Sequence, residues 1–100
     1  MKLVFDEKAL VDLEGIYNWI SKDNPAAARA VVERIFASTE HLATFPQMGH
    51  AGRDEGTFEW VVPRLPYIVV YEIRSERDEV VVVAVVHGAQ DREGKERSGE

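Results

Sequence analysis

The stretch that decides the fold runs Glu59-Trp-Val-Val-Pro-Arg-Leu-Pro-Tyr-Ile-Val-Val-Tyr-Glu-Ile73 and, after a polar break, Glu79-Val-Val-Val-Val-Ala-Val-Val-His87. It is dense in β-branched and aromatic side chains, which fit a pleated and half-buried surface. Pro63 and Pro66 bracket one tight connection, and the polar run Ser75–Asp78 makes another. The pattern predicts three antiparallel strands joined by two hairpins, over Thr57–Val62, Tyr67–Arg74 and Glu79–His87.

The last of these strands is apolar on both faces. Strict alternation would turn one set of side chains to one side of the sheet and the intervening set to the other. The two sets are Val80, Val82, Ala84 and Val86, and Val81, Val83 and Val85. A strand of this kind needs cover on two sides. In the middle strand we expect one face to be core, comprising Tyr67, Val69, Tyr71 and Ile73.

The first half of the chain can supply one cover. The apolar run Lys2–Phe5 is long enough for an edge strand, and Asp6 can cap a helix by accepting from amides of its first turn. Apolar residues then recur at helical spacing, so we expect Trp19 at the edge of a core stripe and Asp12 on the solvated face. The stripe comprises Leu10, Leu13, Ile16, Tyr17 and Ile20.

A second helix is predicted from Pro25 to about Ala43, because asparagine is a good cap and proline is preferred at the first helical position. Two amphipathic helices joined by a tight turn form a hairpin that can cover one face of the sheet. A loop over Phe45–Gly56 follows, and its glycines are expected to form turns. The predicted fold class is therefore α+β, in the order β-α-α-β-β-β. The second helix has the stripe Ala28, Val31, Val32, Ile35, Thr39 and Leu42.

Length and composition limit the class of protein. One hundred residues make a single domain, expected over 1–90, and the polar segment 91–100 is expected to fray. No apolar run reaches the ~20 residues of a membrane helix and no signal sequence is recognisable, so no membrane partner and a cytoplasmic location are predicted. The sequence has no cysteine, and its histidines lack the spacing of metal ligands. We therefore expect no metal and no cofactor.

The charge pattern bears on the partner. A formal net charge of −6 argues against nucleic acid as a direct partner, since a protein that grips a nucleic acid backbone normally shows a positive patch. The arginines could form a local basic edge or could be scattered and solvated, and the pattern favours neither. His87 has a side chain suited to acid–base work, although a hydrogen bond to a turn is the commoner role at a strand end. The arginines concerned are Arg53, Arg64, Arg74 and Arg92.

Four motifs follow one another between Phe5 and Arg92. They are Asp23-Asn24-Pro25-Ala26-Ala27-Ala28; Phe45-Pro46 with Gly49, Gly52-Arg53, Gly56-Thr57 and Glu59; Pro66-Tyr67-Ile68-Val69-Val70-Tyr71; and Val86-His87-Gly88-Ala89. In this order and spacing they resemble the ParE-like toxins of the RelE/ParE superfamily, which belong to bacterial type II toxin–antitoxin systems. The resemblance implies a helical hairpin on a small, mainly antiparallel sheet. It also implies a cognate antitoxin that wraps the toxin, and either a homodimer or a toxin–antitoxin hetero-oligomer.

The resemblance also bears on activity. Characterised ParE members poison DNA gyrase, whereas RelE-type relatives cut mRNA on the ribosome with cations that align here with Glu59, Val61, Ile68 and Gln90. Because none of these four is a cation, the resemblance favours a non-enzymatic gyrase inhibitor. Two alternatives stay open: a ribosome-dependent mRNA endonuclease, and an attenuated toxin that acts mainly as co-repressor with its antitoxin.

The resemblance assigns the candidate residues to two partners. DNA gyrase is expected to contact Arg53, Arg64, Arg74, His87 and Arg92. The antitoxin is expected to lay a helix or strand across the sheet face that the hairpin leaves uncovered, at Val81, Val83 and Val85, because exposed apolar patches mark interaction sites. Such an interface would bury roughly 2,000 Å² or more. Contact with nucleic acid is expected only through the antitoxin.

Overall fold

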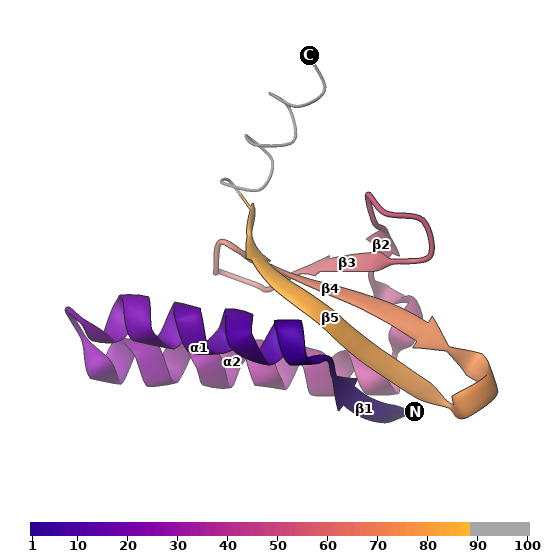
Figure 1. The fold of residues 1–100 in the computed structure, drawn as a ribbon, viewed down its shortest axis with the longest axis horizontal. Coiled ribbons are helices and arrows are strands. Elements are labelled where there is room, and N and C mark those ends of the chain that lie inside the picture. Colours follow the sequence, from indigo (N-terminus) through magenta and orange to yellow (C-terminus); the bar gives the residue numbers. More distant parts are fainter. Residues whose placement is uncertain (89–100) are drawn as a thin grey trace, which may run out of the picture.

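The computed structural model describes residues 1–88, which form two layers: a helical hairpin and a five-stranded sheet (Figure 1). The strand order across the sheet is β1-β5-β4-β3-β2. The α+β fold class predicted from the sequence is confirmed. The elements are β1 (Lys2–Phe5), α1 (Glu7–Ser21), α2 (Pro25–Thr44), β2 (His50–Ala51), β3 (Phe58–Val61), β4 (Tyr67–Arg74) and β5 (Glu79–His87), with 3₁₀ turns at Pro46–Met48 and Ser75–Arg77.

The sheet is mainly antiparallel. β3, β4 and β5 form the two predicted hairpins, and β1 adds to the edge of β5 as the one parallel pair. The short strand β2 was not predicted, because its two residues lie within the glycine-rich loop and pair with only Phe58 and Glu59 of β3. The predicted segment 91–100, together with Gln90 and Arg92, falls outside the described residues.

The two helices begin in different ways. The Asn24 side chain accepts a hydrogen bond from the Ala27 amide at 3.0 Å, and Pro25 occupies the first helical position, as expected. Asp6 stands at the cap position of α1, but its side chain makes no capping hydrogen bond. Its backbone N–H donates instead to the Val82 carbonyl at 2.9 Å, so the start of α1 is fixed by pairing with β5. Neither helix within residues 1–88 is both long and apolar enough to cross a membrane.

Helix α1 presents a different face to the sheet from the one predicted. Ala9 and Leu13 are buried, whereas Leu10 is 49% exposed, Tyr17 is also exposed and Trp19 is 71% exposed. The expected core roles of Leu10, Tyr17 and Trp19 are therefore wrong. Ala9 is fully buried because its small side chain lets the helix pack closely, whereas an apolar stripe is defined by larger side chains. The turn of the helix also brings Asp12, expected in solvent, towards β5.

A β-bulge divides β5 into two parts with opposite side-chain phase. Val82 pairs with Tyr71 and Ala84 pairs with Val70, so Val83 is an extra residue in the ladder. Strict alternation along β5 is therefore wrong beyond Val83. Val85 is 3% exposed and belongs to the core, on the same side as Val82, rather than sharing a face with Val81.

The core lies between the hairpin and the covered face of the sheet, by which we mean the face in contact with α1 and α2. Tyr67, Val69, Tyr71 and Ile73 contribute to it, as the sequence predicted. The stripe predicted for α2 is also buried or half-buried. The buried cluster comprises Ala9, Leu13, Ile35, Leu42, Val62, Tyr67, Val69, Tyr71, Val80, Val82 and Val85.

Tyr71 ties the loop after α2 to this core. Its hydroxyl donates to the Pro46 carbonyl at 2.7 Å and accepts from the Gly49 amide at 3.0 Å. Burial raises the pKa of Tyr71, and the Gly49 hydrogen bond partly opposes that shift. Gly49 has a φ of −73°, which any residue can adopt, so its backbone conformation does not require glycine. Glycine is required there because a Cβ would collide with the Tyr71 hydroxyl and the Glu59 carbonyl.

Candidate protein-binding surfaces

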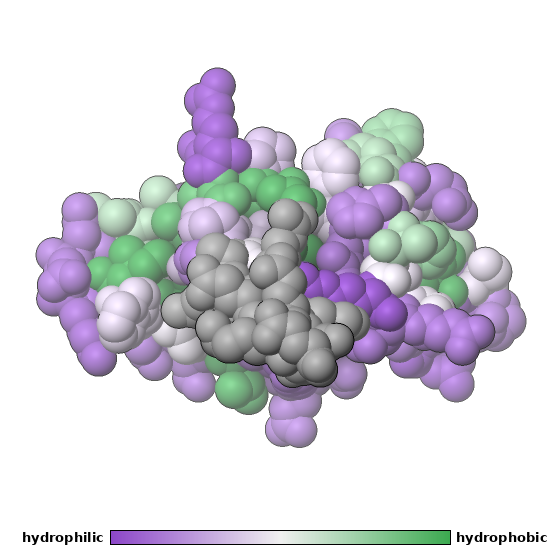
Figure 2. Space-filling model, turned by 90° about the horizontal axis from the view of Figure 1, so that it is seen from above, coloured by the Kyte–Doolittle hydropathy of each residue, from purple (hydrophilic) through white to green (hydrophobic). Residues whose placement is uncertain are grey.

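The sheet face opposite the hairpin, which we call the open face, carries Val81, one of the three positions expected to bind the antitoxin, whereas Val85 lies on the covered face. Val81 is on this face but is only 3% exposed, and Val83 is half-buried. Val61, at 45%, is its most exposed large apolar residue. Figure 2 views the molecule from this side, where hydrophobic and hydrophilic residues lie interspersed. The apolar surface is therefore smaller than the alternation in β5 predicted.

Three positions implied in RelE-type catalysis meet on the open face. The register pairs Val61 with Ile68 and Glu59 with Val70, which places Glu59, Val61 and Ile68 beside one another. Ile68 is 4% exposed. Glu59 is negatively charged, and its carboxylate accepts a hydrogen bond from the Arg53 amide at 3.1 Å. This part of the face is therefore apolar and acidic.

The sequence left open whether the arginines form a basic edge or lie scattered, and the three arginines of this group within residues 1–88 lie apart. Arg64 lies in the turn between β3 and β4, and Arg74 ends β4, so the eight-residue strand separates them by more than about 20 Å. Arg74 is also paired with Glu72, its Nη2 lying 3.0 Å from Oε1. Arg53 follows β2, at the far edge of the sheet from β1. Arg53, Arg64 and Arg74 lie apart because they flank different strands.

His87 lies on the covered side of the sheet, at the end of β5. Its ring meets the Tyr67 ring edge-on, with centroids 5.5 Å apart, and burial raises the pKa of Tyr67. The two rings line a groove of about 570 Å³ against the α1 residues Asp12, Ile16 and Trp19. The bulge explains this placement because it puts Val85 and His87 on the same side of the sheet as Val82. No set of three potential metal ligands comes together within residues 1–88.

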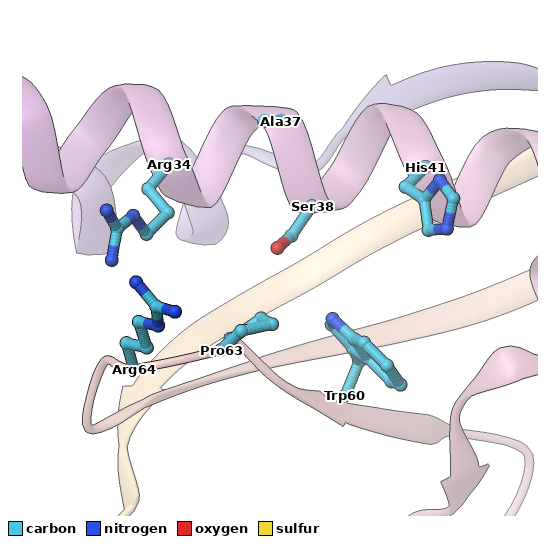
Figure 3. Close-up of a pocket in the computed structure, with 7 residues that line it drawn as sticks. All are labelled: Arg34, Ala37, Ser38, His41, Trp60, Pro63 and Arg64. Carbon is cyan, nitrogen blue, oxygen red and sulfur yellow. The ribbon is translucent and has the colours of Figure 1, made fainter.

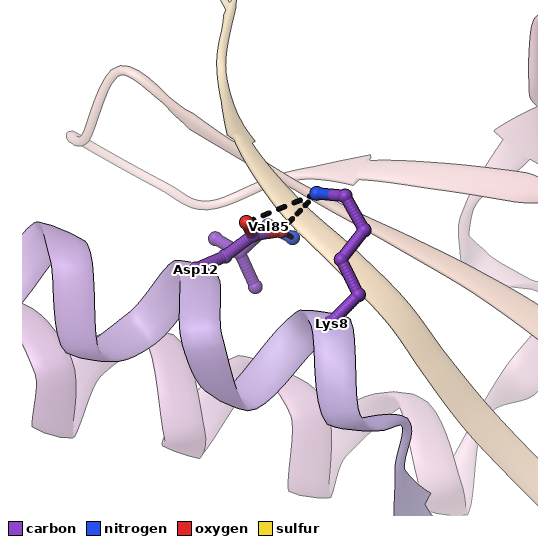
Figure 4. Close-up of polar contacts among 3 residues, drawn as sticks. All are labelled: Lys8, Asp12 and Val85. Atoms are coloured by element: carbon purple, nitrogen blue, oxygen red, sulfur yellow. Dashed lines mark hydrogen bonds and ion pairs between the residues drawn. The ribbon is translucent and has the colours of Figure 1, made fainter.

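Asp12 fastens α1 to β5 in this groove (Figure 4). Its Oδ2 accepts from the Val85 amide at 2.9 Å, and Lys8 Nζ lies 2.8 Å from the same oxygen. The carboxylate therefore satisfies a strand amide just beyond the bulge, where the regular ladder is interrupted. Sequence analysis missed this role because a carboxylate near a helix N-terminus ordinarily faces solvent.

A second groove lies between α2 and the β3–β4 turn (Figure 3). It has a volume of about 410 Å³ and includes two basic side chains, Arg34 and Arg64. We call it the α2–β3 groove; its lining is Arg34, Ala37, Ser38, His41, Trp60, Pro63 and Arg64. The helical part has a signal in the sequence, since Arg34, Ser38 and His41 recur at helical spacing. The strand part could not be found without knowing which strand lies under α2.

Comparison with known proteins defines the class. The fold matches the solved chromosomal ParDE system from P. aeruginosa, with a TM-score of 0.76 and 20% identity over 87% of this chain and 95% of that chain. It also matches the RelBE2 toxin–antitoxin complex from Mycobacterium tuberculosis, with a TM-score of 0.56 and 31% identity over 86% and 95%. The fold is therefore one that occurs in toxin–antitoxin systems.

Sequence comparison gives the family. A curated Sinorhizobium fredii (strain NBRC 101917 / NGR234) protein named "Putative toxin Y4kP" is 41% identical over 83 residues, which is 83% of each chain. The profile described as "ParE toxin of type II toxin-antitoxin system, parDE" matches residues 3–92. The chain belongs to the ParE toxin family.

Proposed function

We propose that this toxin inhibits DNA gyrase by protein–protein contact and that a cognate antitoxin neutralises it. The observation that carries the proposal is the character of the open face at Glu59, Val61 and Ile68. These positions align with cations of RelE-type nucleases, and here they offer one carboxylate and two aliphatic side chains.

The chemistry of RNA cleavage argues against a nuclease. Metal-free cleavage needs a base, an acid and cations that stabilise the negative charge of the phosphorane. Loss of one such transition-state contact typically costs about 10² or more in rate. Ile68 has no charge and is buried, and the Glu59 carboxylate would repel a phosphate. Inhibition of gyrase requires no such group, because the toxin need only bind one state of an enzyme that supplies its own chemistry.

The antitoxin is proposed to bind on the open face. The existence of an antitoxin partner is supported by solved relatives such as the ParDE system of P. aeruginosa and the RelBE2 toxin–antitoxin complex of Mycobacterium tuberculosis. Val61 is available there for apolar contact, and Val86 is half-buried two strands away, across Ile68. Binding to the native toxin should raise its melting temperature in proportion to the logarithm of antitoxin concentration. An unchanged melting temperature would contradict this part of the proposal.

The gyrase proposal is tested with one toxin preparation and two assays. We expect gyrase supercoiling to be inhibited, or cleaved DNA to be trapped, while ribosome-bound mRNA stays intact. Added antitoxin should reverse the gyrase effect. Codon-positioned cuts in mRNA with normal supercoiling would overturn the assignment. Silence in both assays, with the antitoxin still bound, would favour the co-repressor alternative.

The three arginines proposed to contact gyrase are tested one at a time, because they lie apart in the structure. Arg53→Glu, Arg64→Glu and Arg74→Glu should each be compared for gyrase inhibition and for melting temperature. A surface substitution usually changes stability by within about 0.5 kcal/mol. Loss of inhibition with unchanged melting temperature would identify a contact residue. Full inhibition by all three variants would remove these arginines from the proposed contact, and Arg29→Glu on the exposed side of α2 is the matched control.

A further inference from the structure

We propose that the α2–β3 groove is a separate binding site for a short acidic protein segment, one that carries a carboxylate beside an apolar side chain. The groove joins the hairpin to the β3–β4 turn on the covered side of the sheet (Figures 1 and 3). It is thus distinct from the open face and does not rest on the gyrase proposal. The site is built from three observations: two convergent guanidinium groups, a strained arginine and an indole donor.

The two guanidinium groups face one another across the groove. Arg34 extends from α2 and Arg64 from the turn, and their ends point toward each other in Figure 3. Neither is within ion-pair distance of a carboxylate among residues 1–88, although carboxylates are abundant in this acidic protein. Two like charges held together gain by binding an anion between them. Arginine also offers a planar fork that fits a carboxylate.

The backbone of Arg64 is in an unfavourable conformation. Its φ is +67°, in the left-handed region, where a residue with a Cβ costs roughly 1–2 kcal/mol. The turn is fixed by the Val62 amide, which donates to the Tyr67 carbonyl at 3.0 Å. Glycine would adopt this φ without strain, so the arginine is not the residue that turn geometry alone would select. Such outliers cluster at functional sites, and here the strained residue projects into the groove.

Trp60 supplies the third part of the site. Its indole nitrogen points towards α2 in Figure 3, and within residues 1–88 its N–H has no hydrogen-bond acceptor. The indole ring, Ala37 and Pro63 form an apolar surface beside the two arginines. A ligand that fits must therefore combine an acceptor for the N–H, a negative charge and an adjoining apolar group. An acidic peptide segment has all three.

Charge distribution favours a peptide over a nucleic acid. A polyanionic strand would follow a positive stripe and would be repelled by a protein of net charge −6. The basic groups here form one compact pair with no carboxylate in the groove lining. A short segment with one or two carboxylates gains from that pair. The distant negative charges of the protein are screened beyond about 8–10 Å at physiological salt.

The test uses the full chain carrying Trp19→Phe, which changes an exposed residue and leaves Trp60 as the sole indole. The probe is a nine-residue peptide of glutamate and leucine, titrated to millimolar concentration and followed by the ¹H–¹⁵N signals of the Trp60 indole and the arginine side chains. We expect saturable shifts of the Trp60, Arg34 and Arg64 signals. The same peptide with glutamine in place of glutamate should give no saturable shift.

Two variants separate binding from folding. R34Q/R64Q should raise the dissociation constant of the peptide at least tenfold while keeping the dispersed spectrum of a folded protein. The matched variant R29Q should leave the dissociation constant unchanged. Absence of shifts, or equal shifts with the glutamine peptide, would overturn the proposal. Tighter binding of a single-stranded oligonucleotide at the same three side chains would overturn the ligand class. If R34Q/R64Q alters the spectrum globally, Arg34→Gln alone must still weaken binding for the proposal to stand.

Discussion

The two faces of the sheet carry different kinds of side-chain contact. On the covered face, Tyr71 is fully buried and both hydrogen-bonding functions of its hydroxyl are satisfied by backbone groups. On the open face, the exposed Val61 lies beside the carboxylate Glu59. The first face has the close packing that defines one native state, and the second has the mixture of apolar and charged groups typical of a binding surface. Substitutions on the two faces should therefore have different consequences.

The largest expected effect is on the covered face. Ile35→Ala removes a fully buried side chain at the centre of the α2 stripe and should lower the free energy of unfolding by about 2–5 kcal/mol. Urea denaturation of this variant and of Val61→Ala measures the contrast directly. If Val61→Ala cost as much as Ile35→Ala, the open face would be a second core and not a binding surface.

Asp12 is expected to give the next largest effect. Asp12→Ala leaves the Val85 amide without its acceptor and should destabilise the fold by about 1–3 kcal/mol. Asp12→Asn retains an acceptor oxygen and loses the exposed Lys8 ion pair, which is worth about 0–1 kcal/mol. The two variants are compared by thermal unfolding. Equal losses would show that the charge, and not the hydrogen bond to β5, is what matters.

The raised pKa of Tyr71 predicts that the stability of the fold depends on pH in the alkaline range. Because its pKa is raised above the ordinary 10.0 in the folded protein, the folded state holds the phenol proton more tightly than the unfolded chain does. Its contribution to stability is complete below about pH 10 and is lost as pH rises through the raised pKa. Tyr71→Phe should lower stability at neutral pH by about 1–3 kcal/mol, since Gly49 and Pro46 lose their partner.

Unfolding measured between pH 8 and 11 tests this dependence. Wild type should lose more stability across that range than Tyr71→Phe does, and parallel losses would remove Tyr71 as the cause.

The smallest effect on stability is expected on the open face. Val61→Glu changes an exposed side chain and should alter the free energy of unfolding by no more than about 0.5 kcal/mol. It adds a charge beside Glu59, so binding of the antitoxin should weaken measurably. Calorimetric titration checks the affinity, and chemical denaturation checks the fold. Unchanged affinity would place the antitoxin elsewhere on the toxin.

Much of the fold could be predicted from local signals. Asn24-Pro25 has one strong interpretation as a helix start, and the proline pair in the β3–β4 turn separates two apolar runs. The rotation of α1 could not be predicted, because it depends on how closely Ala9 approaches β5. The bulge at Val83 could not be predicted from the sequence either. A run of valines has no alternation of its own, so its register is set only by the partner strand.

The candidate sites were harder to predict than the fold. Residues of one site come from elements far apart in the sequence, and their proximity depends on packing. Arg64 was identified as a candidate, but its neighbours in space are Arg34 and Trp60, not the other predicted arginines. His87 was identified too, but the bulge placed it beside Tyr67. Residue chemistry was readable from the sequence, whereas the grouping of residues required the three-dimensional structure.

The bulge in β5 reverses which face of the sheet the odd-numbered side chains of the strand occupy. Before Val83, odd-numbered residues lie on the open face; beyond it, odd-numbered residues such as Val85 face the helices. If the bulge were closed with Val83 paired in the ladder, every later residue of β5 would pair one position further along β4 and face the other side of the sheet. His87 would then leave Tyr67 and emerge on the opposite side, while Val86 would enter the core. The single extra residue Val83 therefore determines on which face of the sheet the last side chains of β5 lie.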